Sequence, residues 1–202
     1  MASEEADRIV DLYQRRASVW IESRARTGLI EKPWVDRFRA LLPPSGAVLD
    51  LGCGSAEPMA AYLIGLSHPV TGVDSSPAMI EACRERFTTQ DWIVADMRTL
   101  ALQQTFSGIL AWDSFFHLGY DDQRRMFPIF RAHAAPAAAL MFTSGPVHGE
   151  AMGSFAGEPL YHASLDPAEY RSLLERNGFR VVSHVAEDPD CGGHTIWLAQ
   201  LI

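Results

Sequence analysis

The stretch that decides the fold is Val48-Leu49-Asp50-Leu51-Gly52-Cys53-Gly54-Ser55-Ala56-Glu57, followed by the run Val70-Thr71-Gly72-Val73-Asp74. Both runs begin with apolar residues, as buried parallel strands do. The first run breaks at Gly52 and Gly54, where a backbone without Cβ atoms can pass close to a ligand. Asp74 ends the second run, where a carboxylate can accept hydrogen bonds from both hydroxyls of a ribose. The pattern predicts a strand, a turn and a helix that bind a nucleoside.

The residues around this turn indicate a nucleoside without phosphates. Glu57 stands where a dinucleotide fingerprint has a third small residue, and its charge would repel a pyrophosphate. The sequence between Arg39 and Arg84 contains no lysine or arginine that could neutralise phosphate. S-adenosylmethionine fits better, because its ammonium and sulfonium are cations that Asp50, Glu57 and Asp74 would attract.

The pattern Asp50-Leu51-Gly52-Cys53-Gly54 with Asp74 resembles the cofactor signature of the class I S-adenosylmethionine-dependent methyltransferases, and the resemblance covers roughly residues 9 to 202. It implies an α/β, doubly wound, Rossmann-like fold. The sheet of this fold has seven strands and is mostly parallel, with an antiparallel last strand and helices on both faces. The resemblance also implies an enzyme that uses S-adenosylmethionine as its methyl donor.

The rest of the chain alternates between strand and helix patterns, which favours a sheet covered on both faces. Proline in the first turn, at Pro33 and Pro77, predicts two of the helix starts. Helices are expected at 4–26, 33–42, 57–65, 77–87, 121–134 and 166–177. Strands are expected at 47–51, 69–74, 91–95, 107–112, 137–143, 179–186 and 194–201.

We expect a single methyltransferase domain over residues 1–202, made of four parts. Residues 1–44 would form an N-terminal helical lid, and residues 45–143 the cofactor-binding core. Residues 144–165 would form a glycine-rich substrate loop, because long glycine-bearing loops over a sheet edge are usually functional or mobile. Residues 166–202 would supply a helix and a C-terminal hairpin.

Net charge and cysteine content indicate which partners and which cellular location to expect. The net charge of −8 disfavours sequence-independent binding of nucleic acid, so a small-molecule acceptor is expected. Three scattered cysteines are typical of reduced thiols in a cytoplasmic protein. The polar start shows no signal or membrane-spanning segment, so no membrane partner is expected. We expect a cytoplasmic protein that is a monomer or a weak homodimer.

The resemblance supplies further candidate contacts to the cofactor. Asp96 and Met97 follow the third strand, where the family reads adenine, and the backbone of Ala111 or Trp112 would take the ammonium. Tyr13 and one of Arg16 or Arg24 would lie near the methionine carboxylate. The cofactor-binding residues are then Asp50, Gly52, Cys53, Gly54, Asp74, Ser75, Met79, Asp96, Met97, Ala111, Trp112, Tyr13 and Arg24. Met79 has the alternative of being core, and Asp96 that of a solvated acid at a strand end.

Two histidines are candidate catalytic residues. His117 follows the fourth strand, and His194 opens an antiparallel return strand, so both are expected at the cofactor edge of the sheet under the loop 144–164. The unperturbed pKa of imidazole lies near neutrality, which suits a base for an acceptor proton. The alternative is that His117 caps a helix and His194 satisfies backbone groups of the turn 191–193.

The expected reaction is methyl transfer to a small-molecule O, N or S acceptor by in-line displacement, which needs alignment and exclusion of water more than protein chemistry. A nicotinamide oxidoreductase is disfavoured by Glu57, and a serine hydrolase by the absence of a Gly-x-Ser-x-Gly elbow. Cys191 and His194 supply half of a tetrahedral metal set, so no metal is expected. The alternative is a methyltransferase-like fold that binds S-adenosylmethionine as a non-catalytic sensor or scaffold.

Overall fold

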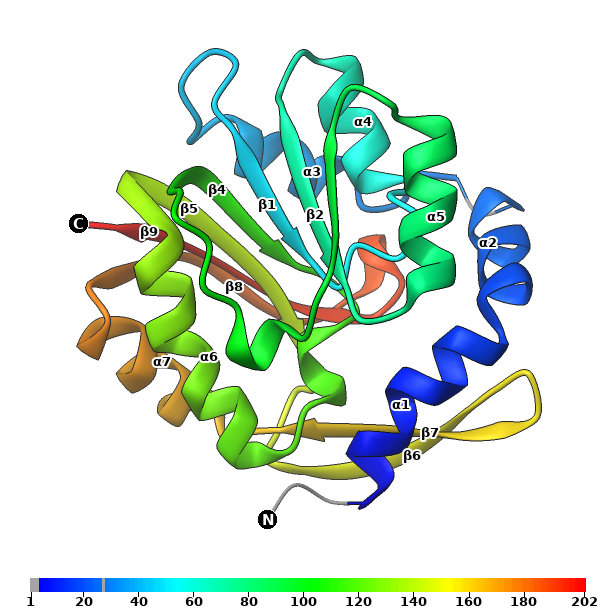
Figure 1. Ribbon diagram of the computed structural model, residues 1–202. Coiled ribbons are helices and arrows are strands. Elements are labelled where there is room, and N and C mark those ends of the chain that lie inside the picture. The colour runs from blue at the N-terminus through cyan, green and yellow to red at the C-terminus, as the bar shows by residue number, and fades with distance from the viewer. Residues whose placement is uncertain (1–3, 27) are drawn as a thin grey trace.

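The computed structural model describes residues 4–26 and 28–202, and its centre is a seven-stranded sheet within those residues (Figure 1). The strands lie in the order β3-β2-β1-β4-β5-β9-β8. β9 is antiparallel to both of its neighbours, and the other observed pairings in this sheet are parallel. The expected fold class is confirmed. The strands are β1 Val48–Leu51, β2 Val70–Asp74, β3 Asp91–Val94, β4 Phe106–Ala111, β5 Ala134–Ser144, β8 Phe179–Asp188 and β9 His194–Leu201.

Each face of the sheet packs on its own set of helices, because successive strand residues point to opposite faces. On one face, Leu49 and Leu51 join a buried cluster with residues of α6 Tyr120–His133 and α7 Pro167–Arg176. On the other face, Val48 joins a cluster with residues of α3 Lys32–Arg39, α4 Met59–Gly65 and α5 Pro77–Arg86. All four residues of β1 are buried, which explains why this strand reads as a continuous apolar run around Asp50.

Strand register brings the ends of three strands to one edge of the sheet. Leu51 of β1 lies opposite Val73 of β2, and Asp50 lies opposite Leu110 of β4. The residues that follow these strands therefore meet at one place. They are the turn 52–57, Asp74 with Ser75, and the segment 112–118.

The first predicted helix, 4–26, is wrong as a single element. The structure has α1 Glu4–Arg15 and α2 Ala17–Arg26, which meet at a bend at Arg16. Tertiary contacts account for the bend. Arg15 and Arg16 both reach the carboxylate of Glu158, each at 2.8 Å, while the ring of Tyr13 packs edge-on against the ring of Trp20 at 5.3 Å.

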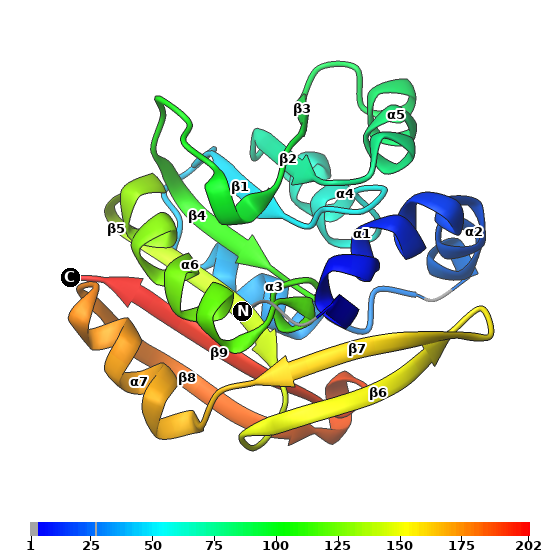
Figure 2. The same cartoon turned by 60° about the horizontal axis from the view of Figure 1, so that its bottom comes forward.

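The expected loop 144–164 is largely a β-hairpin instead. β6 Gly149–Phe155 and β7 Glu158–Ser164 form a separate two-stranded antiparallel sheet, joined by a turn in which Ala156 and Gly157 have positive φ. Of the glycines that suggested a loop, Gly157 lies in this turn, Gly149 and Gly153 lie in β6, and Gly145 lies in the connection from β5. Figure 2 shows the hairpin running alongside α1, and Ile9 packs there on Tyr161 and Ala163.

Two other features bear on the site. α4 begins at Met59, so Glu57 lies before the helix and not in its first turn, where the sequence placed it. Short 3₁₀ turns at Met97–Thr99, Phe115–His117 and Pro189–Cys191 follow strands β3, β4 and β8. In the described ranges, no helix combines the length and the apolar character that crossing a membrane requires.

Candidate functional site

The turn after β1 depends on glycine at position 52. Gly52 has φ +73°, and a Cβ added there would lie 2.2 Å from the Cβ of Ser114. Its amide and that of Cys53 both donate to the carbonyl of Val73, at 2.7 and 3.1 Å, which ties the turn to the end of β2. Gly54 also has positive φ, +51°. The two glycines thus let the backbone pass closely under a cavity.

Two cavities open on this turn, and both are lined by Gly52, Gly54 and Asp113. The first extends from the turn toward the ends of β2 and β3 and is roofed by α1. Its lining includes the predicted residues Tyr13, Asp74, Ser75, Met79, Asp96, Met97 and His117. The second lies toward α2 and α4, and its lining includes Arg24, Asp50, Cys53 and Trp112. An elongated ligand could therefore lie across the turn with one end in each cavity.

Asp74 links the turn to the start of α5. Its carboxylate accepts the amide hydrogens of Gly54, at 2.9 Å, and Ser76, at 2.8 Å. Burial raises the pKa of Asp74, while the hydrogen bonds from Ser76 and Gly54 oppose that shift. Ser76 also caps α5 by accepting from the amide of Met79. Met79 itself is buried and lines the first cavity, so it serves as core and as cavity wall together.

Asp50 lines the second cavity and is buried. Burial, with a smaller effect of the Asp74 charge, raises the pKa of Asp50 to about 7. A cation bound in this cavity would favour the ionised carboxylate. Cys53 packs its side chain in the apolar cluster behind the turn, and burial raises the pKa of its thiol. Its thiol and that of Cys83 both lie near the carbonyl of Gly54, at 3.6 and 3.2 Å.

Three charged side chains beside the cavities form ion pairs, namely those of Asp96, Arg24 and Glu57. Asp96 holds the guanidinium of Arg98 at 2.7 Å and accepts its amide hydrogen, which caps the 3₁₀ turn. Burial raises the pKa of Asp96, but the bonds from Arg98 outweigh it and the net shift is downward. Arg24 holds the fully buried carboxylate of Glu31 at 2.6 Å. Glu57 pairs with Arg86 at 2.6 Å, so part of the charge that argued against a pyrophosphate is neutralised.

Ala111 and Trp112 differ in position although they are neighbours. Ala111 is fully buried in the core, so a contact to a ligand would use its backbone. Trp112 lines the second cavity, and its ring lies 5.3 Å from the ring of His194. The buried Nε1 of Trp112 has no hydrogen-bond partner among the described residues.

Both ring nitrogens of His117 are engaged. Nδ1 lies 2.7 Å from the carbonyl of Tyr161, and Nε2 lies 3.1 Å from the hydroxyl of Tyr13. Burial lowers the pKa of His117 to about 4, so the ring is neutral at physiological pH. The hydroxyl of Tyr13 remains protonated because burial, with Asp113 and Asp74, raises its pKa.

The ring of His194 contacts the carboxylate of Asp113. Its Nε2 is 3.0 Å from one carboxylate oxygen and 3.1 Å from the other, and Nδ1 is 2.6 Å from the carbonyl of Cys191. The hydrogen bond to Asp113 raises the pKa of His194 to about 9. A protonated ring with both nitrogens donating cannot take a proton from an acceptor, so this geometry argues against His194 as a base.

Sequence reasoning missed Asp113 and Ser114, which line the first cavity, and Glu31, which holds Arg24. Asp113 has φ +48°, and its amide donates to Thr143 at 2.9 Å. Its place directly after β4 was a usable signal, since acids at the ends of parallel strands face the ligand edge. Glu31 carried no such signal, because its importance comes from packing between α2 and the core.

Comparisons with known proteins agree with this architecture. A family model described as a methyltransferase domain matches residues 48–137. The uncharacterised methyltransferase YodH of Bacillus subtilis (strain 168) is 30% identical over 151 residues, which are 70% of this chain. The match spans 63% of that relative's length.

Solved structures show the same fold at low sequence identity. The magnesium protoporphyrin IX methyltransferase of Synechocystis PCC 6803 has a TM-score of 0.73 with 15% identity, and the match covers 98% of each chain. The 1,6-didemethyltoxoflavin-N1-methyltransferase of Burkholderia thailandensis has a TM-score of 0.72 with 19% identity, covering 97% of this chain and 86% of that one. Residues 48–137 therefore match a methyltransferase-domain family, and the fold of the chain is that of the two solved methyltransferases.

Proposed function

We propose that the protein transfers a methyl group from S-adenosylmethionine to a small-molecule acceptor by in-line displacement. The observation that carries the proposal is the pair of cavities that meet at Gly52, Gly54 and Asp113. The adenosine would occupy the first cavity, near Asp74, Met79 and Asp96, and the amino-acid end the second. When bound, the cofactor supplies a methyl group already activated by its sulfonium.

The residues around the two cavities suit this ligand. Asp74 would accept from the ribose hydroxyls, and the main chain after β3, at Asp96 and Met97, would meet the adenine. In the second cavity, Arg24 and the unpartnered Nε1 of Trp112 would donate to the methionine carboxylate, while Asp50 would favour the ammonium. Tyr13 would close the cofactor from the side of α1.

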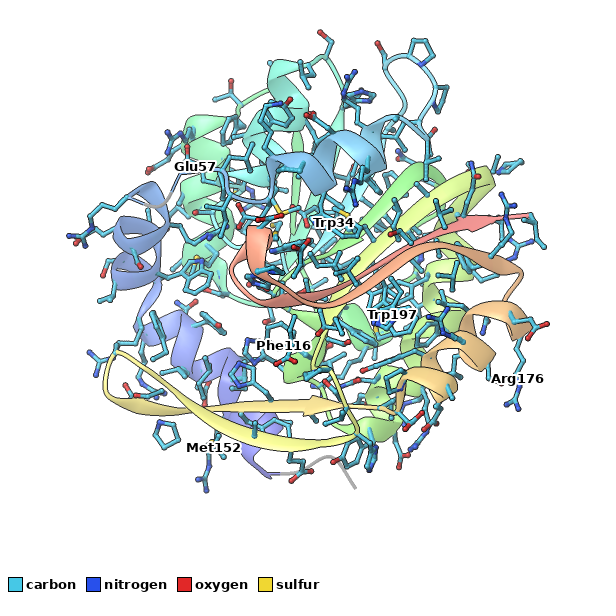
Figure 3. All side chains as sticks on the ribbon, turned by 180° about the vertical axis from the view of Figure 1, so that it is seen from behind. Trp34, Glu57, Phe116, Met152, Arg176 and Trp197 are labelled. Atoms are coloured by element: carbon cyan, nitrogen blue, oxygen red, sulfur yellow. The ribbon has the colours of Figure 1, made fainter. Side chains whose placement is uncertain are left out.

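The protein would align the methyl donor with the acceptor and exclude water from them. We propose that α1 and α2 serve as a lid, and that the hairpin β6–β7, which replaces the expected substrate loop 144–165, covers the acceptor. Figure 3 supports this placement, since Phe116 lies between the central sheet and the hairpin, while Met152 lies on the side of the hairpin that faces α1. His117 would orient the acceptor through Tyr13 and not by removing a proton itself.

Two of the solved structures support a small-molecule acceptor. The Burkholderia thailandensis structure is described with bound 1,6-didemethyltoxoflavin and S-adenosylhomocysteine, and the Synechocystis structure with bound S-adenosylmethionine. The charge of −8 gives no support to nucleic acid as the acceptor. A cytoplasmic location and a monomer or weak homodimer complete the proposal.

Calorimetry with S-adenosylmethionine and S-adenosylhomocysteine tests the cofactor. Both should bind, and Asp74→Ala should weaken binding by about 1.5–3 kcal/mol through lost charge-assisted hydrogen bonds. Tyr62→Phe, which removes a hydroxyl bonded to Asp36, is the control variant and should bind normally. Absence of binding to the wild-type protein would refute the proposal.

Turnover separates an enzyme from a sensor. Incubation with a metabolite extract and S-adenosylmethionine carrying a deuterated methyl group should yield a labelled product that mass spectrometry detects. Binding of the cofactor without any labelled product from extracts that support other methyltransferases would favour the sensor or scaffold.

A further inference from the structure

The polar side chains around the His117 end of the first cavity have already committed their hydrogens to other groups. The carbonyl of Tyr161 can only accept, so Nδ1 of His117 must carry the proton of that 2.7 Å bond. The neutral ring then has an unprotonated Nε2, which must accept from the hydroxyl of Tyr13 at 3.1 Å. The hydroxyl oxygen of Tyr13 keeps only lone pairs to offer a ligand.

Two neighbours in the cavity lining have the same polarity. The hydroxyl of Ser114 donates to the carbonyl of Leu51 at 2.7 Å, so its oxygen also keeps only lone pairs. Both carboxylate oxygens of Asp113 accept from Nε2 of His194, at 3.0 and 3.1 Å, and its amide hydrogen goes to Thr143, so this residue also offers a ligand only lone pairs. The guanidinium of Arg98, which also lines this cavity, bonds to Asp96 and Asp122 at 2.7 and 3.2 Å.

Aromatic rings pack around Tyr13, which lines the same cavity. The ring of Tyr13 lies 5.5 Å from that of His117 and 5.7 Å from that of Phe155, and the ring of Trp20 lies 5.6 Å from that of Phe155. Aromatic faces attract cations, whereas they offer nothing to an anion. The hydrogen-bonding polarity and the rings therefore favour a ligand group that is rich in N–H donors and carries or develops positive charge.

We propose that the acceptor atom is an amine nitrogen, held by hydrogen bonds from its two N–H groups to the hydroxyl oxygens of Tyr13 and Ser114, with the Asp113 carboxylate beside it. This inference rests on the proposed methyl transfer and narrows its acceptor class. A carboxylate or phosphate acceptor would face lone pairs and a negative charge. A hydroxyl acceptor has one hydrogen to offer and would need a base, but the nitrogens of His117 and His194 are engaged.

The chemistry needs no protein base. The lone pair of the neutral amine forms the bond to the methyl carbon while the carbon–sulfur bond breaks and leaves its electron pair on sulfur as a thioether. The nitrogen gains the positive charge that the sulfonium loses. The Asp113 carboxylate and the ring of Tyr13 stabilise this charge, and the extra proton leaves the product to water after release.

The test uses two analogues of S-adenosylhomocysteine in which nitrogen replaces sulfur. One carries a 2-aminoethyl arm on that nitrogen and the other a 2-hydroxyethyl arm, so they differ only in the group placed where an acceptor would lie. Calorimetry on the full chain should show the amino analogue binding about tenfold or more tightly than the hydroxy analogue.

Two variants test whether the hydroxyl groups of Tyr13 and Ser114 cause the preference for the amino analogue. Tyr13→Phe and Ser114→Ala should each reduce the ratio of the two affinities to about threefold or less, whereas Tyr62→Phe should leave it unchanged. Binding of S-adenosylhomocysteine to each variant shows that it is folded. If Tyr13→Phe fails that control, Ser114→Ala decides the assignment.

The outcomes are separable. Equal or tighter binding of the hydroxy analogue by the wild-type protein overturns the amine assignment and leaves the proposed methyl transfer standing. The same holds if S-adenosylhomocysteine binds but neither armed analogue does. An unchanged ratio in both site variants also overturns the assignment. Failure of S-adenosylhomocysteine itself to bind refutes the proposed function.

Discussion

Gly52 is the residue at which the fold and the candidate site constrain each other most tightly. It has φ +73°, and its missing Cβ leaves the space in which Ser114 packs to reach the carbonyl of Leu51. A side chain at this position would both strain the backbone and displace Ser114. The turn therefore cannot be altered without moving a residue that lines the first cavity.

Gly52→Val should lower the affinity for S-adenosylhomocysteine by about 100-fold or more and reduce the free energy of unfolding by about 1–3 kcal/mol, because a Cβ would stand against Ser114. Calorimetry measures the first effect and urea unfolding the second. Gly65→Ala is the matched control, since a Cβ there meets nothing within 4 Å. Normal ligand affinity in a folded Gly52→Val protein would show that the turn is not the ligand's floor.

His194 should stabilise the protein in a defined pH range. Its pKa is raised to about 9 by Asp113, against about 6.5 in an unfolded chain, so the folded state holds the proton more tightly. The stabilisation is then fully present below about pH 6.5 and is lost as the pH rises through about 9. The side chains of His194 and Asp113 are 24% and 21% exposed, so solvent screens the pair only in part.

His194→Gln should lower the free energy of unfolding by about 1–3 kcal/mol at pH 6, and the difference from the wild type should shrink by pH 10. Urea unfolding of both proteins at the two pH values measures it, and taking the difference cancels the titration of other groups. A difference that stays constant between pH 6 and pH 10 would show that the Asp113 contact does not hold the proton.

At the scale of elements, sequence patterns predicted what depends on local periodicity. The strand β1, the glycine turn and the start of α5 at Pro77 all follow from neighbouring residues, and the structure contains each of them. The bend at Arg16 could not be predicted in that way, since it depends on Glu158, which is distant in sequence. The hairpin β6–β7 could not be predicted either. Its glycines indicated a loop, and only the pairing of β6 with β7 shows that they belong to a hairpin.

In the candidate site too, local sequence placed some residues, whereas the state of others depends on distant partners. Asp74 could be placed because it is the last residue of its strand, and it does line a cavity on the turn. The states of the two histidines could not be inferred, because they depend on the carbonyls of Tyr161 and Cys191 and on Asp113. These partners come from other elements, and spacing in a single sequence does not reveal them.

At the scale of the whole molecule, the first cavity lies between the edge of the sheet and α1, which packs on the hairpin through Ile9. Ile9, Val10 and Tyr13 of α1 line it on one side. α1 is tied to the hairpin by ion pairs of Glu158 with Arg15 and Arg16, whose side chains are 57% and 43% exposed. Exposed pairs of this kind contribute about 0–1 kcal/mol, so α1 should open more easily than the core.

Ligand binding should therefore protect α1 from hydrogen exchange far more than it protects the face of the sheet covered by α6 and α7. At a ligand concentration about 100 times the dissociation constant, the complex is about 2.7 kcal/mol more stable than the free protein. Any opening that releases the ligand then becomes about 100 times rarer. Amide exchange followed by mass spectrometry, with and without S-adenosylhomocysteine, measures the protection of each segment. Slower exchange in α7 with no change in α1 would mean that the ligand enters by another route and that α1 is a fixed wall. Slower exchange in α1 that is abolished by Asp74→Ala would show that the helix closes over the ligand bound at the end of β2, because Asp74 touches the turn and α5 but has no bond to α1 among the described contacts.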